Sequence, residues 1–179
     1  MQFDKELQDV RTVAIAGHVR PDGDSVGACI GLWHYIRDNF PQIQADIWLE
    51  KPDEKFAVLA GFDAIRQAGE EKDAYDLFVA VDCAVCDRLG DAVPYFDCAG
   101  RTICVDHHVS NEGYAELNVI DADASSTCEV LCRMMDPDKI SRETAAALYT
   151  GIAHDTGVFQ YGCTSPDTMR MAAMLMEKG

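Results

Sequence analysis

A polar octet between two apolar stretches constrains the fold of this chain more than any other feature. The octet reads His18-Val19-Arg20-Pro21-Asp22-Gly23-Asp24-Ser25. The stretch before it, residues 13–16, is short and predicts a buried strand, whereas residues 26–33 after it repeat apolar side chains at helical spacing. A strand, a loop and a helix in this order are typical of an α/β domain, in which ligand sites lie beyond the carboxyl ends of the strands.

The same alternation of strand and helix patterns continues along the chain. Strands are expected at residues 12–17, 45–49, 76–82, 101–105 and 116–120. Helices are expected at residues 1–11, 25–39, 54–61, 125–135, 142–153 and 166–178. A chain of 179 residues with this order predicts one α/β domain, with a doubly wound, mainly parallel sheet and helices on both faces.

The octet itself carries one imidazole, His18, and two carboxylates, Asp22 and Asp24. Gly23 is expected to let the backbone bend between the two acids. Carboxylates held this close repel each other unless a cation lies between them. A solvated turn that ends in a helix N-cap at Asp24 or Ser25 explains the octet equally well, so the octet alone leaves both interpretations open.

Metal-type ligands recur in four separate segments of the chain, and three of these segments lie at predicted strand ends. The segments contribute His18, Asp22 and Asp24; Asp82; Asp106, His107 and His108; and Asp155. A parallel sheet would bring the strand ends to one edge. An oxygen-rich set with a few imidazoles suits Mn²⁺ or Mg²⁺. Because the set exceeds the needs of one ion, two ions that share a carboxylate are expected.

The charge of the chain bounds its partners. The 15 basic and 31 acidic residues give a net charge of −16, which argues against binding of duplex DNA. A small phosphorylated substrate stays compatible, because bound cations supply positive charge locally. The first residues lack the apolar core of a signal peptide, and no apolar run reaches membrane-spanning length. We therefore expect a cytoplasmic protein without a membrane partner, whose eight cysteines stay reduced.

Two weaker signals lie beside the predicted ligands. Cys83-x-x-Cys86 has the spacing of a redox or zinc motif, but no second well-spaced pair completes a zinc site, so zinc or redox use is disfavoured. His154 adjoins Asp155 and either contacts the site or is an ordinary histidine at a helix end. The chain has neither a Walker A loop nor a G-x-G-x-x-G segment, which excludes P-loop and Rossmann cofactor sites.

Four ordered motifs, which span nearly the whole chain, resemble those of the DHH phosphoesterase superfamily. The motifs are His18–Ser25 with the pattern H-x-x-P-D-G-D-S; Val81-Asp82 with Arg88-Leu89-Gly90 after it; Asp106-His107-His108 within residues 105–111; and Asp155-Thr156-Gly157 within residues 151–159. The residue patterns of the first and third motifs resemble, in particular, those of the NrnA-like type of bifunctional oligoribonuclease and PAP phosphatase.

This resemblance implies a role for each residue of the motifs. One cation would be held by His18, Asp22 and Asp82. The other would be held by Asp24, Asp82, His107 and Asp155, so that Asp82 bridges the two ions. The remaining roles would fall to Asp106, which orients a histidine, to His108, which contacts the phosphate being cleaved, and to Arg88, as a further substrate contact.

The resemblance also implies an enzyme with two divalent cations, Mn²⁺ in the first place and Mg²⁺ as the alternative. The cations would generate a bridging hydroxide that attacks phosphorus in line. The substrates would be short oligoribonucleotides, cleaved to 5′-mononucleotides, or pAp, which would lose its 3′-phosphate. A family-two inorganic pyrophosphatase or a phosphodiesterase for linear or cyclic dinucleotides are alternative enzymes. A non-catalytic nucleotide sensor is the alternative of another class.

Relatives of this type carry a smaller C-terminal domain that grips the substrate. Residues 1–179 are expected to form the DHH catalytic domain alone, without that segment. Such a domain would bind metal but turn substrate over poorly, because remote contacts to base and ribose hold the substrate in line. A homodimer is an open alternative to a monomer.

Overall fold

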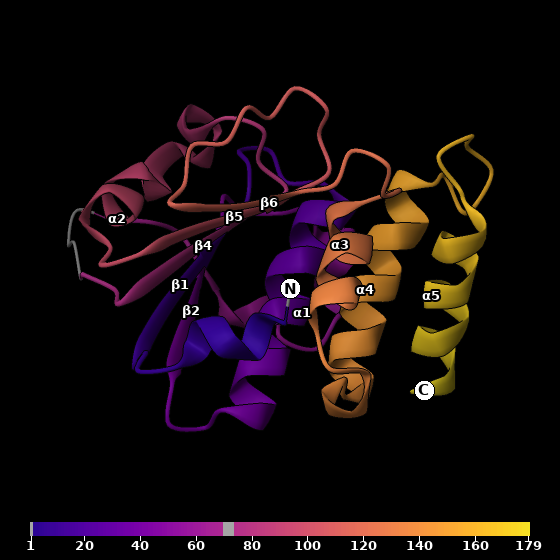
Figure 1. Ribbon diagram of the computed structural model, residues 1–179, viewed down its shortest axis with the longest axis horizontal. Helices are drawn as coiled ribbons and strands as arrows, with labels where there is room; N and C mark the ends of the chain where they lie inside the picture. Colours follow the sequence, from indigo (N-terminus) through magenta and orange to yellow (C-terminus); the bar gives the residue numbers. More distant parts are fainter. Residues whose placement is uncertain (1, 70–73) are drawn as a thin grey trace.

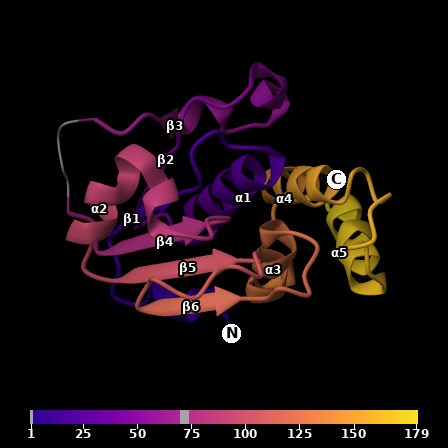
Figure 2. The ribbon, with the colours of Figure 1, turned by 90° about the horizontal axis from the view of Figure 1, so that it is seen from above.

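The computed structural model describes residues 2–69 and 74–179. Its centre is a six-stranded sheet with the order β3-β2-β1-β4-β5-β6, in which every neighbouring pair is parallel. Figure 2 shows β4, β5 and β6 pointing the same way. The strands are β1 (Thr12–Ala16), β2 (Gln44–Trp48), β3 (Ile65–Arg66), β4 (Leu77–Val81), β5 (Thr102–Asp106) and β6 (Leu117–Ile120). The predicted doubly wound α/β fold is therefore confirmed.

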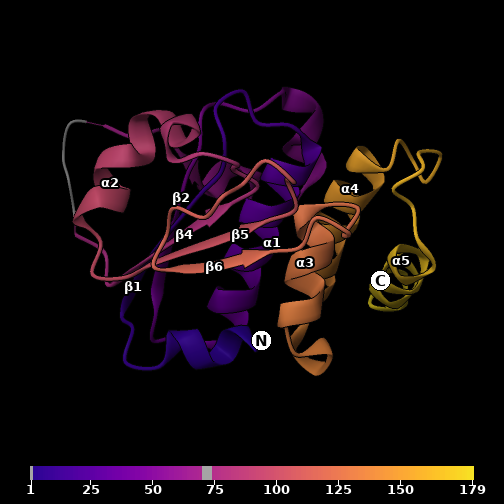
Figure 3. The same ribbon diagram turned by 45° about the horizontal axis from the view of Figure 1, so that its top comes forward.

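Helices cover both faces of this sheet. The α-helices are α1 (Gly23–Asn39), α2 (Val93–Cys98), α3 (Thr127–Met134), α4 (Arg142–Asp155) and α5 (Pro166–Glu177). Short 3-10 segments cover Phe3–Leu7, Glu54–Val58, Phe62–Ala64, Cys86–Ala92 and Pro137–Lys139. Helices α1, α3 and α4 lie on one face and α2 lies on the other, while α5 packs outside α4 (Figures 1 and 3). No helix within the described ranges is both long enough and apolar enough to cross a membrane.

The central strands place alternate side chains in two hydrophobic cores. On β1, Val13 and Ile15 belong to the core under α1, α3 and α4, whereas Ala14 and Ala16 belong to the core that contains Tyr95 of α2. All five residues of β4 are buried. A parallel strand covered on both faces has no solvent side, which explains why these strands are continuous apolar runs in the sequence.

Most predicted elements agree with the structure to within two residues, and two differ by more. The expected helix at residues 1–11 is the 3-10 segment Phe3–Leu7, because Asp9 adopts a left-handed φ of 61° that no helix continues; Met1 lies outside the described residues. The expected helix at residues 54–61 ends at Val58, since Leu59 returns to an extended conformation. The helix predicted at residues 25–39 begins earlier, at Gly23.

Asp22 is the reason for this early start. Its carboxylate accepts hydrogen bonds from the amides of Asp24 at 3.0 Å and Ser25 at 3.2 Å, so Asp22 is the N-cap of α1. The N-cap that the sequence suggested at Asp24 or Ser25 is therefore wrong. Because Asp24 does not cap the helix, its side chain is available for other contacts.

Glycines allow α1 and α4 to approach each other closely. A Cβ atom added to Gly27 of α1 would lie 2.5 Å from the carbonyl oxygen of Ala147 and 3.0 Å from the amide nitrogen of Gly151, both in α4. Real Cβ atoms do not come this near to backbone atoms. The close contact holds the first turn of α1, with Asp24, against the helix that ends at Asp155.

We expect Gly27→Ala to lower the free energy of unfolding by about 1–3 kcal/mol, because backbone on both helices must move apart. Gly162→Ala is the matched control, since a Cβ at Gly162 meets nothing within 4 Å. Urea unfolding of both variants measures the difference. Equal stabilities of the two variants would show that the helix contact is looser than the structure has it.

Candidate metal centre

The predicted ligands meet at the point where the chain reverses its path through the sheet. The chain runs outward from β1 to β2 and β3, then crosses back to β4 on the other side of β1. The loop with His18 follows β1, Asp82 follows β4, and His107 follows β5. In open α/β sheets ligands bind in the crevice at such a point.

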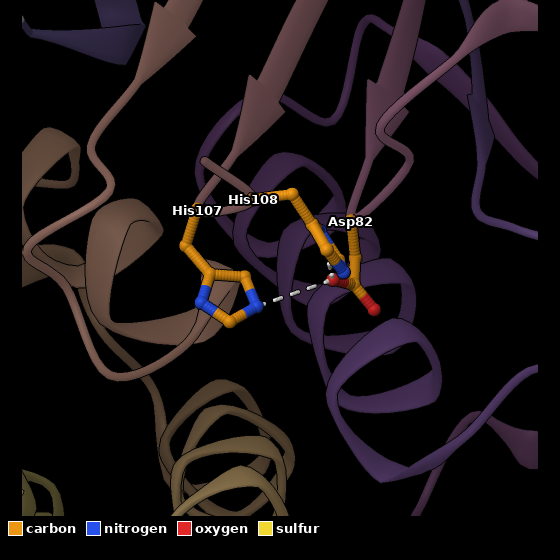
Figure 4. A group of neighbouring side chains, drawn as sticks. All are labelled: Asp82, His107 and His108. Carbon is orange, nitrogen blue, oxygen red and sulfur yellow. Dashed lines mark ion pairs between the residues drawn. The ribbon is translucent and has the colours of Figure 1, made fainter. Parts of the chain in front are cut away.

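Asp82 lies in the middle of the ligand set and is 2% exposed. Its Oδ2 atom lies 3.3 Å from Nε2 of His18. Its Oδ1 atom lies 3.8 Å from Nε2 of His107 and 3.7 Å from Nδ1 of His108. Figure 4 shows the two neighbouring histidines directed at this carboxylate. The two oxygens of Asp82 therefore face two different groups of donors.

His18, Asp22 and Asp82 form the first group, whose possible ligand atoms all lie within 4.8 Å of one another. Nε2 of His18 lies 3.8 Å from Oδ2 of Asp22. Nδ1 of His18 lies 2.8 Å from the carbonyl oxygen of Val19, to which it donates when it carries the proton. A ring held in this way keeps Nε2 directed at the carboxylates, as in many metal-binding histidines.

Asp24, His107 and Asp155 form the second group, which satisfies the same distance limit. Nε2 of His107 lies 3.2 Å from Oδ2 of Asp155 and 3.9 Å from Oδ2 of Asp24. Asp24 is fully buried, and the amides at the start of α3 donate to it, Thr127 at 2.7 Å and Cys128 at 3.0 Å. These two hydrogen bonds fix the position of the Asp24 carboxylate.

Asp106 stands behind the centre and orients His108. Nδ1 of His108 lies 2.8 Å from Oδ1 of Asp106, and Nδ2 of Asn111 donates to Oδ2 of Asp106 at 2.7 Å. Asp106 is fully buried, whereas the side chain of His108 is 35% exposed. The histidine that Asp106 orients is thus His108, which opens toward solvent. His108 also shares a possible ligand group with Asp82 and His107.

Neighbouring carboxylates strongly favour the protonated forms of two imidazoles when no cation is present. Burial opposes the charge on His18, but hydrogen bonds to Asp22 and Asp82 outweigh it and raise its pKa to about 10. Burial likewise opposes the charge on His107, and Asp155, Asp24 and Asp82 together raise its pKa to about 9. Both imidazole rings are therefore positively charged at neutral pH, and they offset the charge of the carboxylates when no metal ion is bound.

Two carboxylates of the centre are costly to keep ionised. Burial, followed by the charges of Asp82 and Asp155, raises the pKa of Asp24 well above its usual value. Burial also raises the pKa of Asp82, against the hydrogen bond from His18. In the described part of the chain, every ion-pair partner of Asp24 and Asp82 is a histidine. Buried anions without a lysine or arginine fit divalent cations, and the oxygen-rich donors suit Mn²⁺ or Mg²⁺.

Arg88 and His154 lie at the edge of the centre. Nη2 of Arg88 lies 3.2 Å from Nδ1 of His18, on the side of the ring turned away from the carboxylates. His154 lies within reach of Asp22 and Asp155. Gly23 belongs to α1 and serves close approach rather than bending, since a Cβ there would lie 2.5 Å from Cγ of His154.

Two residues that support the centre were not assigned a role from the sequence. Thr127 donates through its hydroxyl to Oδ1 of Asp82 at 3.3 Å, as well as through its amide to Asp24. Asn111 anchors Asp106. Asn111 ends the third motif, which could have drawn attention to it. Thr127 is the first residue of α3, and Ser126 before it is the N-cap of that helix.

All eight cysteines are free thiols. Cys83 is buried directly after Asp82, and its sulfur donates to the carbonyl oxygen of Val85 at 3.2 Å. Burial raises the pKa of the Cys83 thiol to about 12. A neutral, buried thiol at this position packs as a small apolar side chain.

The chain is similar to known proteins both in sequence and in structure. Residues 12–152 match the DHH family, N-terminal domain. Over 91% of its length the chain is 31% identical to the bifunctional oligoribonuclease and PAP phosphatase NrnA of Mycoplasma pneumoniae, covering 52% of that protein. It is 29% identical over 93% of its length to the protein of the same name from Thermus thermophilus, covering 50%.

A solved structure from Bacteroides fragilis, titled an exopolyphosphatase-related protein, has a TM-score of 0.86 and 25% identity. This match covers 99% of the chain and 55% of that protein. The chain thus spans about half the length of the relatives that it matches. Because the family match extends from the start of β1 into α4 and includes nearly every predicted ligand, the chain belongs to the DHH family of phosphoesterases.

Proposed function

We propose that this chain hydrolyses short oligoribonucleotides to 5′-mononucleotides or removes the 3′-phosphate of pAp. The reaction uses two divalent cations, for which Mn²⁺ is the first choice. The observation that carries the proposal is the position of Asp82, whose two oxygens face two separate groups of histidine and aspartate donors. Its relatives named bifunctional oligoribonuclease and PAP phosphatase support the choice of substrates.

In this proposal His18, Asp22 and Asp82 hold one cation, and Asp24, Asp82, His107 and Asp155 hold the other. When bound, the two cations supply a nucleophilic water and positive charge for the phosphoryl oxygens. The hydrogen bonds from α3 to Asp24 and from Thr127 to Asp82 keep the carboxylates in place before the cations arrive. Such preorganisation spares the site from rearranging during the reaction.

His108 is the proposed proton donor to the leaving oxygen. Its hydrogen bond to Asp106 raises its pKa against the opposing effect of burial. With Nδ1 bonded to Asp106, Nε2 is the atom that gives up a proton toward the exposed side. A protonated imidazole at this place also offers a hydrogen bond to the phosphoryl group. Arg88 is a weaker substrate candidate, because it contacts the far side of His18.

Cation binding should release protons, because His18 and His107 must become neutral to act as ligands. Their pKa values of about 10 and about 9 in the free protein mean that both are protonated at neutral pH. We expect the affinity for Mn²⁺ to rise as pH rises toward these values, and both histidines to release protons when Mn²⁺ binds near pH 7. A pH-stat titration with Mn²⁺ measures the release. An affinity independent of pH would exclude these two histidines as ligands.

The proposed reaction is tested with a panel of substrates and Mn²⁺. We expect hydrolysis of a diribonucleotide or of pAp, and a loss of that activity with chelator and in Asp82→Asn. Faster hydrolysis of pyrophosphate than of both nucleotides would favour the inorganic pyrophosphatase instead. Hydrolysis confined to other linear or cyclic dinucleotides would favour a dinucleotide phosphodiesterase. Tight nucleotide binding without turnover of any substrate would favour the sensor.

A further inference from the structure

A cavity of about 160 Å³ is lined by residues that neighbour His18 and Arg88 in the chain, and the proposed reaction gives it no role. Gly17 and Val19, the two neighbours of His18 in the chain, line it on one side. Leu89 and Gly90, which directly follow Arg88, line it on another. The loops that position His18 therefore form both the edge of the metal centre and a wall of this cavity.

An immobilised aromatic ring forms part of the cavity wall. Trp48, at the end of β2, lines the cavity. It stacks on Tyr95 of α2 with ring centroids 4.8 Å apart and an angle of 14° between the planes. Its Nε1 donates to the hydroxyl of Tyr75 at 3.0 Å. Leu49 and Ala92 add apolar surface. A rigid wall of this kind suits a flat, uncharged ring, because little side-chain freedom is lost on binding.

The described residues that line the cavity include carboxylates and no lysine or arginine, although the Arg66 guanidinium lies over the Trp48 ring, 5.9 Å from its centroid. Glu50 and Asp91 line it, both exposed, and Oε2 of Glu50 accepts the amide of Arg20 at 2.8 Å. Ionised carboxylates accept hydrogen bonds and donate none. They repel a second phosphate but accept the amino and hydroxyl protons of a nucleoside. The cavity chemistry therefore selects against phosphate and pyrophosphate.

We propose that this cavity binds the nucleoside of the substrate while its phosphate lies at the metal centre. The proposal rests on the phosphoester function and names the part of the substrate that the chain recognises. It predicts a preference for nucleotides over pyrophosphate, since pyrophosphate has no group to place against Trp48. Recognition by the nucleoside is a remote contact of the kind that orients a phosphate for attack.

The chain offers a direct reporter of this cavity, because it has two tryptophans and only Trp48 lines the cavity. Each tryptophan gives one indole N–H signal in a nitrogen-15 NMR spectrum, and Trp33→Phe assigns them. We expect adenosine, and AMP with Mg²⁺, to shift the Trp48 signal and to leave the Trp33 signal in place. Ribose 5-phosphate with Mg²⁺ should leave both signals in place, because it brings no ring to the cavity.

Variants that fill the cavity supply the matched test. Ala68→Phe places a large side chain in the lining of the cavity. Gln67→Phe does the same from an exposed position, where the substitution should not lower the stability of the fold. Both should weaken AMP binding by about tenfold or more and leave pyrophosphate binding unchanged. Ala146→Phe, an exposed substitution on α4, is the control and should change neither.

The outcomes separate this proposal from the proposed function. The proposal that the cavity binds a nucleoside would be overturned if neither adenosine nor AMP shifts the Trp48 signal. It would also be overturned if both filling variants bind AMP with unchanged affinity. If AMP still binds to the Mg²⁺-loaded protein in that case, the metal centre stands without it. In another outcome, adenosine shifts the Trp48 signal, the filling variants abolish that shift, and Mg²⁺ does not raise the affinity for AMP. That outcome would support nucleoside binding in the cavity and contradict the proposed phosphoester function.

Discussion

Asp82→Asn is expected to empty both halves of the metal centre and to lower turnover by about a hundredfold to a thousandfold or more. The substitution keeps the shape of the side chain but removes the charge that faces both donor groups. Asp82 has a left-handed φ of 53°, which asparagine tolerates better than most residues, so the backbone should keep its conformation. Metal counting by mass spectrometry on dialysed protein measures the loss.

Asp46→Asn is the matched control for this variant. Asp46 is also a buried carboxylate, but it lies on β2, where it pairs with Arg66 at 3.1 Å and accepts from Tyr75. Its loss should affect stability and leave the cations bound. His18→Ala should empty mainly the first site. Two ions retained in Asp82→Asn would refute a carboxylate shared between the sites.

His108→Ala is expected to keep both cations and to lower turnover by about a hundredfold to ten-thousandfold, the usual contribution of general acid catalysis. The reason is its position: its Nδ1 is taken by Asp106 and its side chain is 35% exposed, so it is placed to act on substrate. The loss should fall on kcat more than on KM. Single-turnover kinetics with a dinucleotide measure the chemical step directly.

His107→Ala is the contrasting variant next to it in the chain. His107 lies 3.2 Å from Asp155 and shares a donor group with Asp24, so its loss should reduce cation occupancy first. Excess Mn²⁺ should restore part of its activity and none of the activity of His108→Ala. Equal loss of metal in the two variants would mean that His108 is a ligand, as its place beside Asp82 also allows.

The sheet and the convergence of the acids were predictable because both follow from local patterns. Continuous apolar runs that end in acids predict buried parallel strands, and parallel strands place their carboxyl ends at one edge. The structure brings the residues after β1, β4 and β5 together in this way. Strand β3 was not predicted, because its two residues are too few to show the apolar pattern of a strand. The 3-10 segment Cys86–Ala92 and α2 escaped because the backbone breaks at Gly90 and their apolar spacing is irregular.

The support that Thr127 gives to the centre could not be predicted, because it joins residues far apart in the chain. Thr127 and Asp24 are 103 residues apart, and only the packed fold brings the start of α3 to the buried carboxylate. Gly23 was expected to permit a bend, yet it provides space for His154, which is a tertiary reason. The orientation of His108 by Asp106 is local, and the third motif contains all the residues that form it.

The most direct measurement of the central claim is the anomalous diffraction of crystals soaked in Mn²⁺. We expect two peaks, one among His18, Asp22 and Asp82 and the other among Asp24, His107 and Asp155, with a carboxylate oxygen of Asp82 bound to each ion. In Asp82→Asn both peaks should vanish or weaken together. A single peak in the wild-type crystal, or two peaks that Asp82 does not join, would contradict the two-cation centre.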